Sequence, residues 1–591
     1  MKAFYSAPEA LETRIAPAAV FVDATSLTIS LSTSGALKIA PKVANSSVEV
    51  HLQQLENGDF LITDAAGDDD LEETADFTGN VTSVNVALGN GDDLVDVALL
   101  GANGFRGSLS ISTALGDDSV TVSEGLLKGP LSITTKANSE ITLGGSDLNI
   151  RGAVSVAQVG GSFTLEEGSL LGSLSASGAN AFELLGSVRG SASLKATTAA
   201  SFAVGTLGSS PATTIKGGLT ITGSAGDDSL ELANVNVSGA FSASLGAGNN
   251  DTSIGSGVRV DGTAKFSGTT GTDEFHFGSL ADGGPRFNGT LSVNGGSSGG
   301  ANLIEVLSGI YAGGFSYSGG TSDDSAVFGS TTTTGPALYG KLSLSLGNAT
   351  TANSAAIYSG TYGAGASING GIADDSLVIG SATTDGPSFF AKVSTSLNLA
   401  TTANQAQILS GLFVGGLSLT GGNADDSVTF GTAATAGPQF YSKVSVSLGS
   451  SITTNTLNAV SGLFGAGFSV SAGVNADLLT FGSELNLRAD LSVSAGAGAN
   501  TVSVGTFSDA IKFSYSGGAG VDKLTLAGVG SGFVMGSANL GDGDDLLTVA
   551  PTAGDFFFTF TVDGSTGNDT ATVPAGVIGA GFVLKKFETI S

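Results

Sequence analysis

Aspartates gathered in glycine-rich turns are the residues of this chain best suited to chemistry. One group near the start comprises Asp68, Asp70, Asp92, Asp93, Asp117 and Asp118, and one near the end comprises Asp542, Asp544, Asp545 and Asp569. Carboxylate oxygens are the ligands that a hard cation prefers, so Ca²⁺ is the candidate ion for both groups, and no other cofactor is indicated. The alternative is that each aspartate caps its own turn by accepting backbone N–H groups.

Aspartate and asparagine alternate in the middle of the chain. Both residue types recur every 51 positions, which predicts a repeating unit made of two coils. If equivalent residues of successive coils stack ~4.8 Å apart, an asparagine amide can donate to the neighbouring carboxylate, and the aspartates do not crowd each other. This pattern predicts a structural ladder that needs no metal, formed by Asp273, Asn302, Asp324, Asn353, Asp375, Asn404, Asp426, Asn455 and Asp477.

The same corner position continues on both sides of this block. The expected stations before it are Asp93, Asp118, Asn138, Asn180, Asp228 and Asp251, and those after it are Asn500, Asp522, Asp545 and Asp569. Because aspartates follow one another directly at both ends, the terminal groups lack the alternation that relieves repulsion in the middle. A bound cation would relieve the repulsion between the aspartates of each terminal group.

A further periodic group lies on the longer connections. A proline recurs in four of these connections, and in the last three aromatic residues and then a lysine follow it, again at intervals of 51. We expect these loops to form a ridge with one tooth every second coil, ~9.6 Å apart, which could bind another copy, a glycan or an anionic polymer. Alternatively the rings fold over the core and the lysines stay solvated. The candidate contact residues are Pro285, Pro336, Tyr339, Lys341, Pro387, Phe390, Lys392, Pro438, Tyr441 and Lys443.

Short strands must position all these residues. Segments such as LSLSLG and VSVSLG alternate apolar and polar residues with period two, and 91 glycines supply tight corners. The chain is therefore predicted to be all-β, a right-handed parallel β-solenoid of about 21 coils of 22–29 residues. We expect a leader for export or anchoring at 1–18, capping strands at 19–66, the solenoid at 67–553 with its double repeat over 273–477, and capping or subunit-joining strands at 554–591.

Composition narrows the function. The net charge of −30 and the 22 scattered lysines and arginines disfavour nucleic acid as a partner. There is no cysteine for disulfides and no apolar run long enough to cross a membrane. The sequence around the two histidines, His51 and His276, shows no cluster of catalytic residue types, so we do not expect an enzyme.

Two resemblances point to the cell surface. The stretch LETRIAPA at 11–18 resembles the N-terminal LEPR-type motif of repeat-rich surface proteins of planctomycete and verrucomicrobial bacteria, with Thr13 in place of proline. The turns LGNGDD (88–93) and LGDGDD (540–545) resemble RTX-type calcium-binding repeats, although those recur every nine residues and these once per coil. The first resemblance implies an exported, non-enzymatic β-rich protein, and the second implies Ca²⁺.

These observations lead to two functional expectations. The first is a non-catalytic structural protein, extracellular or on the surface of a bacterium, whose copies join head to tail into a fibre or layer through the strand edges at the ends. The second is a monomeric adhesin or stalk that binds glycans or calcium. Neither involves nucleic acid or a transmembrane segment.

Overall fold

The structure is a computed structural model of the 591-residue chain. It describes residues 19–23, 27–64, 73–77, 81–145, 147–206, 212–281, 283–397, 400, 402–433, 437–505, 511–527, 533–550, 556–574 and 581–591. They belong to two compact units, Met1–Thr198 and Ala199–Ser591.

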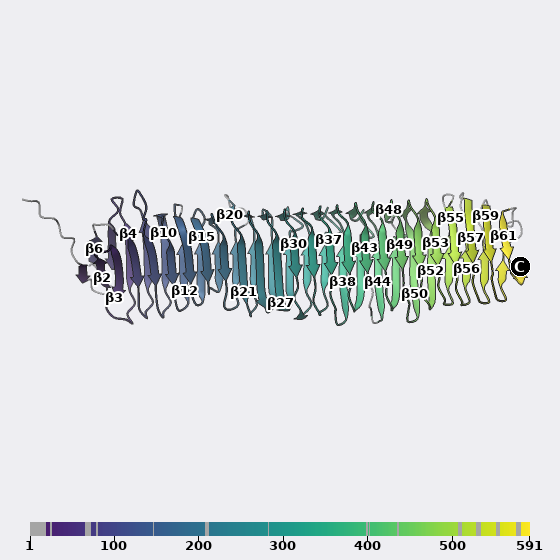
Figure 1. The fold of residues 1–591 in the computed structure, drawn as a ribbon, viewed down its shortest axis with the longest axis horizontal. Helices are drawn as coiled ribbons and strands as arrows, with labels where there is room; N and C mark the ends of the chain where they lie inside the picture. The colour runs from purple at the N-terminus through teal and green to yellow at the C-terminus, as the bar shows by residue number, and fades with distance from the viewer. Residues whose placement is uncertain are drawn as a thin grey trace, which may run out of the picture. The chain divides into compact units, whose positions relative to one another are not determined.

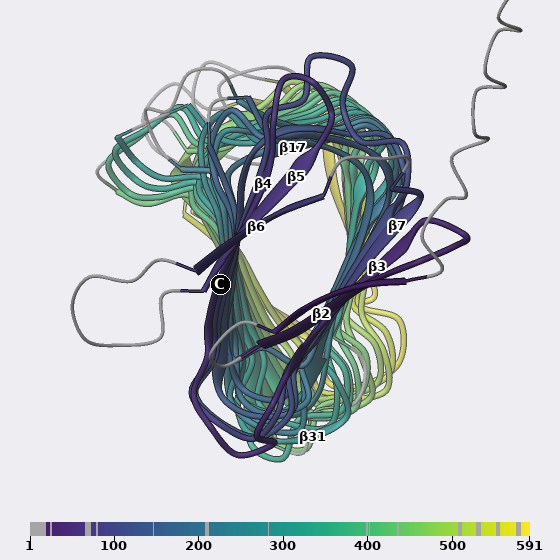
Figure 2. The ribbon, with the colours of Figure 1, turned by 90° about the vertical axis from the view of Figure 1, so that its left-hand side faces the viewer.

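Unit 1 begins with strands that run antiparallel. Strand β2 (Leu27–Ser32) pairs antiparallel with β1 (Ala19–Asp23) and with β3 (Ala36–Pro41). In the same way β5 (Phe60–Asp64) pairs antiparallel with β4 (Glu49–Gln54) and β6 (Glu73–Phe77). Figure 2 shows these strands in purple, in front of the later coils of their unit. β1, β2, β5 and β6 thus lie beside β3 and β4 through antiparallel pairing.

The parallel stack starts earlier than the expected residue 67. Strand β3 pairs parallel with β7 (Ser83–Ala87), and β4 pairs parallel with β8 (Leu94–Leu99). The segment 36–54 is therefore already a coil. The sequence obscures this because the antiparallel pair β5–β6 is inserted into the first coil, which places Glu49 opposite Leu94, 45 positions later.

The rest of unit 1 consists of parallel strands from successive coils. They are β9 (Ser108–Ser112), β10 (Ser119–Leu127), β11 (Leu131–Thr134), β12 (Ser139–Leu143), β13 (Asn149–Ala157), β14 (Gly161–Leu165), β15 (Leu170–Ser177), β16 (Ala181–Leu184), β17 (Ser187–Val188) and β18 (Ala192–Lys195). The shortest step is from Leu170 to Ser187, 17 residues, below the expected minimum of 22.

In the double repeat of unit 2, strands of successive coils stack into three parallel sheets (Figure 1). The first sheet follows the Asp and Asn corners, and its strands in the double repeat are β28 (Asp273–Phe277), β32 (Leu303–Val306), β35 (Ser325–Phe328), β38 (Ala352–Ile357), β41 (Asp374–Ile379), β44 (Ala403–Ile408) and β47 (Asp425–Phe430). Two-residue strands form the second, namely β29 (Arg286–Phe287), β33 (Ile310–Tyr311), β36 (Ala337–Leu338), β39 (Thr361–Tyr362), β42 (Ser388–Phe389), β45 (Leu412–Phe413) and β48 (Gln439–Phe440).

The third sheet is rich in serine. Its strands in this region are β30 (Leu291–Asn294), β34 (Phe315–Ser318), β37 (Leu342–Ser345), β40 (Ala366–Asn369), β43 (Val393–Ser396), β46 (Leu417–Thr420) and β49 (Val444–Ser447). The coils before the repeat contribute β19 (Ser201–Val204), β20 (Thr213–Ile215), β21 (Leu219–Ser224), β22 (Ser229–Leu232), β23 (Val235–Val237), β24 (Phe241–Ala247), β25 (Asn250–Ile254), β26 (Arg259–Val260) and β27 (Ala264–Gly271), and between β30 and β32 lies β31 (Ser298–Gly299).

After the repeat the coils continue to the end of the chain. Their strands are β50 (Thr454–Phe464), β51 (Phe468–Ser471), β52 (Ala476–Leu487), β53 (Leu491–Ser494), β54 (Thr501–Val504), β55 (Ile511–Ser516), β56 (Lys523–Leu526), β57 (Phe533–Asn539), β58 (Leu546–Val549), β59 (Phe556–Asp563), β60 (Thr570–Thr572), β61 (Phe582–Lys585) and β62 (Thr589–Ile590). Strands β59, β61 and β62 pair parallel with the preceding coils, so the segment 554–591 extends the stack.

Alternation explains why these segments are strands. In β35, β41 and β47 every second side chain is buried and the others are partly exposed. The second sheet buries a column of rings, in which Phe389 stacks between Tyr362 and Phe413 at centroid distances of 4.7 and 5.2 Å. This column supplies core contacts along the stack that isolated two-residue strands would lack.

The predicted fold class is confirmed. The described chain is all-β, without helix, and its parallel coils number about 20 over the two units. The right-handed sense of the coil stays a prediction. In the part of the chain that is described, there is no helix of the length and apolarity needed to span a bilayer.

Candidate functional site

The corner residues form the ladder that the sequence predicted. In the first sheet Asn353 lies opposite Asp375, and Asn404 lies opposite Asp426. All nine predicted residues from Asp273 to Asp477 are at most 3 % exposed, so the ladder is a buried polar column inside unit 2. Buried polar groups need hydrogen-bond partners, and neighbouring coils supply them.

Two sets of hydrogen bonds connect the ladder. Asparagine Nδ2 donates to the next aspartate's Oδ1 in the pairs Asn250–Asp273, Asn302–Asp324, Asn353–Asp375, Asn404–Asp426 and Asn500–Asp522, at 2.7, 2.8, 3.2, 2.9 and 2.9 Å. Asparagine Oδ1 accepts the preceding aspartate's backbone N–H at 3.0 or 3.1 Å in Asp228–Asn250, Asp273–Asn302, Asp324–Asn353, Asp375–Asn404, Asp426–Asn455 and Asp477–Asn500. The amide thus serves both neighbours, as its donor and acceptor atoms allow.

Two predicted stations lie one residue away from the corner. The ladder residue of its coil is Asn250 rather than Asp251, since Asn250 pairs with Asp273 while Asp251 is exposed. Ser139 takes the place expected for Asn138, because Ser119 lies opposite Glu140. A shift of one residue exchanges the two faces of a strand. The apolar residues Ile141 and Leu143, two and four positions on, already favour Ser139, whereas the polar Thr252 two positions after Asn250 gives no such signal.

Aspartates follow one another directly at the two ends. The backbone N–H of Asp522 donates to Asp545 Oδ1 at 2.8 Å, and that of Asp545 donates to Asp569 Oδ1 at 2.9 Å. Near the start, the N–H of Asp93 donates to Asp118 Oδ1 at 3.1 Å. The second oxygens of Asp93 and Asp545 have no hydrogen-bond partner among the described residues.

Burial raises the pKa of ladder carboxyls. It raises that of Asp273, Asp375, Asp426 and Asp477 to about 6, and the amide hydrogen bonds only partly oppose this. The pKa values of Asp93 and Asp545 also rise to about 6, mainly through burial and secondarily through neighbouring aspartates. Part of the ladder therefore gains protons in weakly acidic solution.

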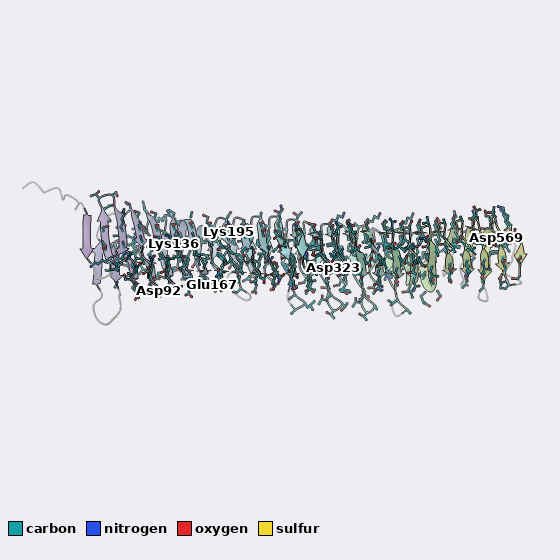
Figure 3. All side chains as sticks on the ribbon, turned by 90° about the horizontal axis from the view of Figure 1, so that it is seen from below. Asp92, Lys136, Glu167, Lys195, Asp323 and Asp569 are labelled. Atoms are coloured by element: carbon teal, nitrogen blue, oxygen red, sulfur yellow. The ribbon has the colours of Figure 1, made fainter. Side chains whose placement is uncertain are left out.

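The predicted metal ligands divide into buried and exposed residues. Asp93, Asp118, Asp545 and Asp569 are ladder residues. The exposed Asp92, labelled in Figure 3, accepts the N–H of Asp117 at 2.9 Å, and Asp544 accepts the N–H of Asn568 at 2.8 Å. Asp542 accepts the hydroxyl of Thr566 at 2.5 Å. Each of these three aspartates accepts a hydrogen bond from the turn of the next coil, 24 or 25 residues later, so these contacts join neighbouring turns.

No three His, Cys, Asp or Glu side chains in the described residues are arranged to hold a metal. Asp68 and Asp70 lie outside the described residues, as does the stretch 11–18. Calcium binding at either terminal group stays a prediction, and titration calorimetry with Ca²⁺ is the measurement that decides it.

A second, outer column had not been predicted. Asp323, labelled in Figure 3, accepts the backbone N–H groups of Thr350, Thr351 and Ala352 at 3.0, 2.8 and 3.3 Å. Hydrogen bonds from Thr351 lower the pKa of Asp323 to about 2. Asp374 and Asp425 hold the equivalent loops one and two repeats later. The signal was the Asp-Asp-Ser triplet at 323–325, 374–376 and 425–427.

Only part of the predicted ridge reaches the surface. Tyr339, Phe390 and Tyr441 are 62 %, 53 % and 55 % exposed. Lys341, Lys392 and Lys443 are exposed as well. The rings Phe389 and Phe440, one position earlier in the chain, belong to the buried column. Both expectations for the aromatics are therefore realised, each by a different residue.

The four prolines anchor the ridge loops instead of lining a contact surface. Pro285, Pro336, Pro387 and Pro438 are buried. Their carbonyl oxygens accept backbone N–H groups of the next coil, at 2.8 to 2.9 Å, from Ile310, Thr361, Leu412 and Leu463.

An open pocket of about 590 Å³ lies between two ridge loops. Its lining includes Asp385, Ser388, Leu412 and Gln439. The hydroxyl of Tyr441 is 3.5 Å from Gln439 Oε1, so the pocket adjoins the ridge. The lining combines hydroxyl, amide and carboxylate groups with apolar surface.

The histidines contact carboxylates on outward positions. His276 is 3.0 Å from Glu305 and 3.4 Å from Glu274. His51 is 2.8 Å from Glu49. Neither histidine is among the residues that line the pocket. These contacts are ordinary pairs between neighbouring strand positions.

Fold and site together define a parallel β-solenoid with a buried Asp–Asn ladder and an exposed row of repeated side chains on one side. Neither the models of protein families nor the curated proteins include one that matches this chain. The proposals below therefore rest on its own residues.

Proposed function

We propose that this chain is a non-catalytic structural protein of the bacterial surface, and that its copies join through the ends of the solenoid into a fibre or layer. The repeated coils support a structural role, because the aspartate and asparagine side chains of the ladder connect neighbouring coils. The ladder residues hydrogen-bond to each other and to the backbone. Side chains committed in this way are not free for catalysis.

The C-terminal edge is the observation that carries self-assembly. Among the described residues, β61 pairs only with β59, and β62 pairs only with β60. The side chains of Val583 and Ile590 on these strands are exposed. An unpaired strand edge with apolar side chains is a site where another chain can add a strand.

Sedimentation velocity over a range of protein concentrations, with negative-stain microscopy of the same samples, tests this proposal. The native chain should form larger species as its concentration rises. The variant Val583→Lys/Ile590→Lys should stay monomeric, because charge at the edge opposes strand addition. A matched control is Ile372→Lys/Ile452→Lys, which charges two exposed apolar residues elsewhere in unit 2.

A native chain that sediments as one monomeric species at every concentration contradicts assembly. Antibody labelling of intact cells tests the surface location separately. Labelling only after the cells are opened contradicts that part of the proposal.

The second candidate function is a monomeric stalk that binds glycans or calcium. The antiparallel strands at the start of unit 1 favour it, because a capped end does not continue a parallel stack. The exposed rings of the ridge favour it as well.

A further inference from the structure

Three aromatic side chains stand in solvent at one repeated position. Tyr339, Phe390 and Tyr441 are each 51 residues apart, and each is more than half exposed. The outward-facing position two residues earlier is Ala337, Ser388 or Gln439, so it varies freely between repeats. An aromatic ring that is exposed to solvent adds little to the stability of the fold. Its recurrence in three successive repeats therefore indicates that the rings contact another molecule.

A lysine accompanies each ring. Lys341, Lys392 and Lys443 follow the rings at a distance of two residues and are exposed. None forms an ion pair with another described residue. In a chain of net charge −30, three regularly spaced and unpaired cations form a local site for negative charge. We call these six residues the ring–lysine comb.

The intervening coils carry smaller residues than the teeth of the comb at the equivalent positions. The pairings of β36, β39, β42, β45 and β48 place one coil between successive rings. That coil carries Gly363 or Val414 beside the rings, and Gly365 or Gly416 beside the lysines. Both Gly365 and Gly416 have positive φ, 78° and 81°, so the backbone turns there without a side chain. The teeth therefore repeat at ~9.6 Å, twice the spacing of strands.

This interval matches the repeat of a particular class of polymer. In an extended β-linked polysaccharide every second sugar presents the same face, and one disaccharide is about as long as two strand spacings. Aromatic rings stack on the apolar C–H face of a sugar, and ammonium groups pair with carboxylates. A chain with one carboxylate per disaccharide would place a sugar face at each ring and a charge at each lysine.

We propose that the ring–lysine comb binds a linear acidic polysaccharide with a disaccharide repeat and one carboxylate in each repeat. This inference deepens the second candidate function, since it names the glycan class that the ridge would take. The pocket at Ser388 and Gln439 adjoins the last two teeth, where its polar side chains can hydrogen-bond to hydroxyl groups of the bound sugar.

The test is calorimetric titration of the full chain with defined oligosaccharides. The acidic probes are hyaluronan fragments, in which glucuronate alternates with N-acetylglucosamine, and the neutral probe is cellohexaose. The three teeth span ~19 Å, so affinity should rise from the disaccharide to the hexasaccharide and then level. Raising the salt concentration should weaken binding, because the lysines are exposed.

Two variants divide the comb. Tyr339→Ala/Phe390→Ala/Tyr441→Ala should lower the affinity for the hyaluronan hexasaccharide about tenfold or more. Lys341→Gln/Lys392→Gln/Lys443→Gln should lower it to a similar degree and remove the preference over cellohexaose. The matched control Lys265→Gln/Lys512→Gln/Lys523→Gln makes the same charge change on exposed lysines of β27, β55 and β56, and should bind as the native chain does. All substituted residues are exposed, so folding should be kept, as circular dichroism checks.

Several outcomes overturn the inference. They are no binding at millimolar hyaluronan fragment, equal affinity for cellohexaose, unchanged affinity of the ring variant, or a ring variant whose only change is loss of self-association. Sedimentation of the native chain is measured independently, so failure of glycan binding and failure of assembly are distinguished.

Discussion

Individual asparagines keep the ladder intact because only they can donate as well as accept. Asn353 shows this most fully. Its Nδ2 donates to Asp375 Oδ1 and to the Gly370 carbonyl at 3.2 and 3.1 Å, while its Oδ1 accepts the N–H of Asp324 at 3.0 Å. Replacing the amide by a carboxylate would leave the acceptor and remove the donor.

The variant Asn353→Asp should therefore be destabilised at neutral pH. Three carboxyls would then follow one another in a buried column, and the cost is about 2–4 kcal/mol of local stability. The loss should shrink in weak acid, because the introduced carboxyl, once protonated, could donate again. Thermal unfolding and amide exchange at residues 324–375 measure it.

The matched control is Asn348→Asp, which makes the same chemical change at an exposed position. Equal unfolding temperatures for the two variants at neutral pH would mean that the asparagine amides do not support the ladder.

At the scale of elements, the outer aspartates hold loops onto the sheets. Asp323 binds three successive backbone N–H groups of the loop that leads into β38. This contact lies at the surface, so it contributes little to global stability. Its effect is local: it fixes the conformation of the loop that connects β37 to β38.

Removing this clamp should free the loop without unfolding the coil. In Asp323→Ala, amides 350–352 should exchange faster, while the global free energy of unfolding changes by less than about 1 kcal/mol. The depressed pKa of Asp323 means that its contribution is present above the ordinary value of 3.8 and is lost as the pH falls through about 2.

Hydrogen exchange followed by mass spectrometry measures both effects. Asp251→Ala removes an exposed aspartate on β25 and serves as the control. Unchanged exchange at 350–352 in the Asp323 variant would show that the loop is held by its own threonines.

At the scale of the whole molecule, the buried carboxyls dominate the response to pH. Burial raises the pKa of Asp93, Asp273, Asp375, Asp426, Asp477 and Asp545 from 3.8 to about 6. Between these values the folded chain binds more protons than the unfolded chain, so stability falls as the pH rises. The contribution is complete below 3.8 and is lost above about 6.

The unfolding temperature should accordingly be higher near pH 5 than near pH 8. Repulsion within a chain of charge −30 acts in the same direction. The contribution of Asp323, whose pKa is lowered to about 2, is complete above the ordinary value of 3.8 and so does not change across this range. Calorimetric scans across this range, at constant ionic strength, provide the measurement.

An unfolding temperature that rises steadily toward pH 8 would contradict this account. It would mean that the ladder carboxyls are ionised throughout, and that cations or hydrogen bonds compensate for their burial.

The sequence by itself determined the coil and the central ladder. A period of 51 with apolar residues two and four positions after each corner leaves Asp324, Asn353 and Asp375 one arrangement in which the apolar side chains are buried and the amides meet the carboxylates. Stacked coils repeat a local pattern, so a local pattern is sufficient to predict them.

Only the tertiary structure decided which of two adjacent residues faces inward and how the first coil is covered. Asn250 rather than Asp251 entered the ladder, and Phe389 rather than Phe390 entered the ring column. The reason is that strand alternation has a period of two, so the turn before each strand sets its face. The antiparallel strands β1, β2, β5 and β6 pair with near neighbours in the sequence, such as Asp23 with Thr28. Their place beside the first coil depends on the parallel pairing of β3 with β7 and of β4 with β8, segments 47 and 45 residues apart.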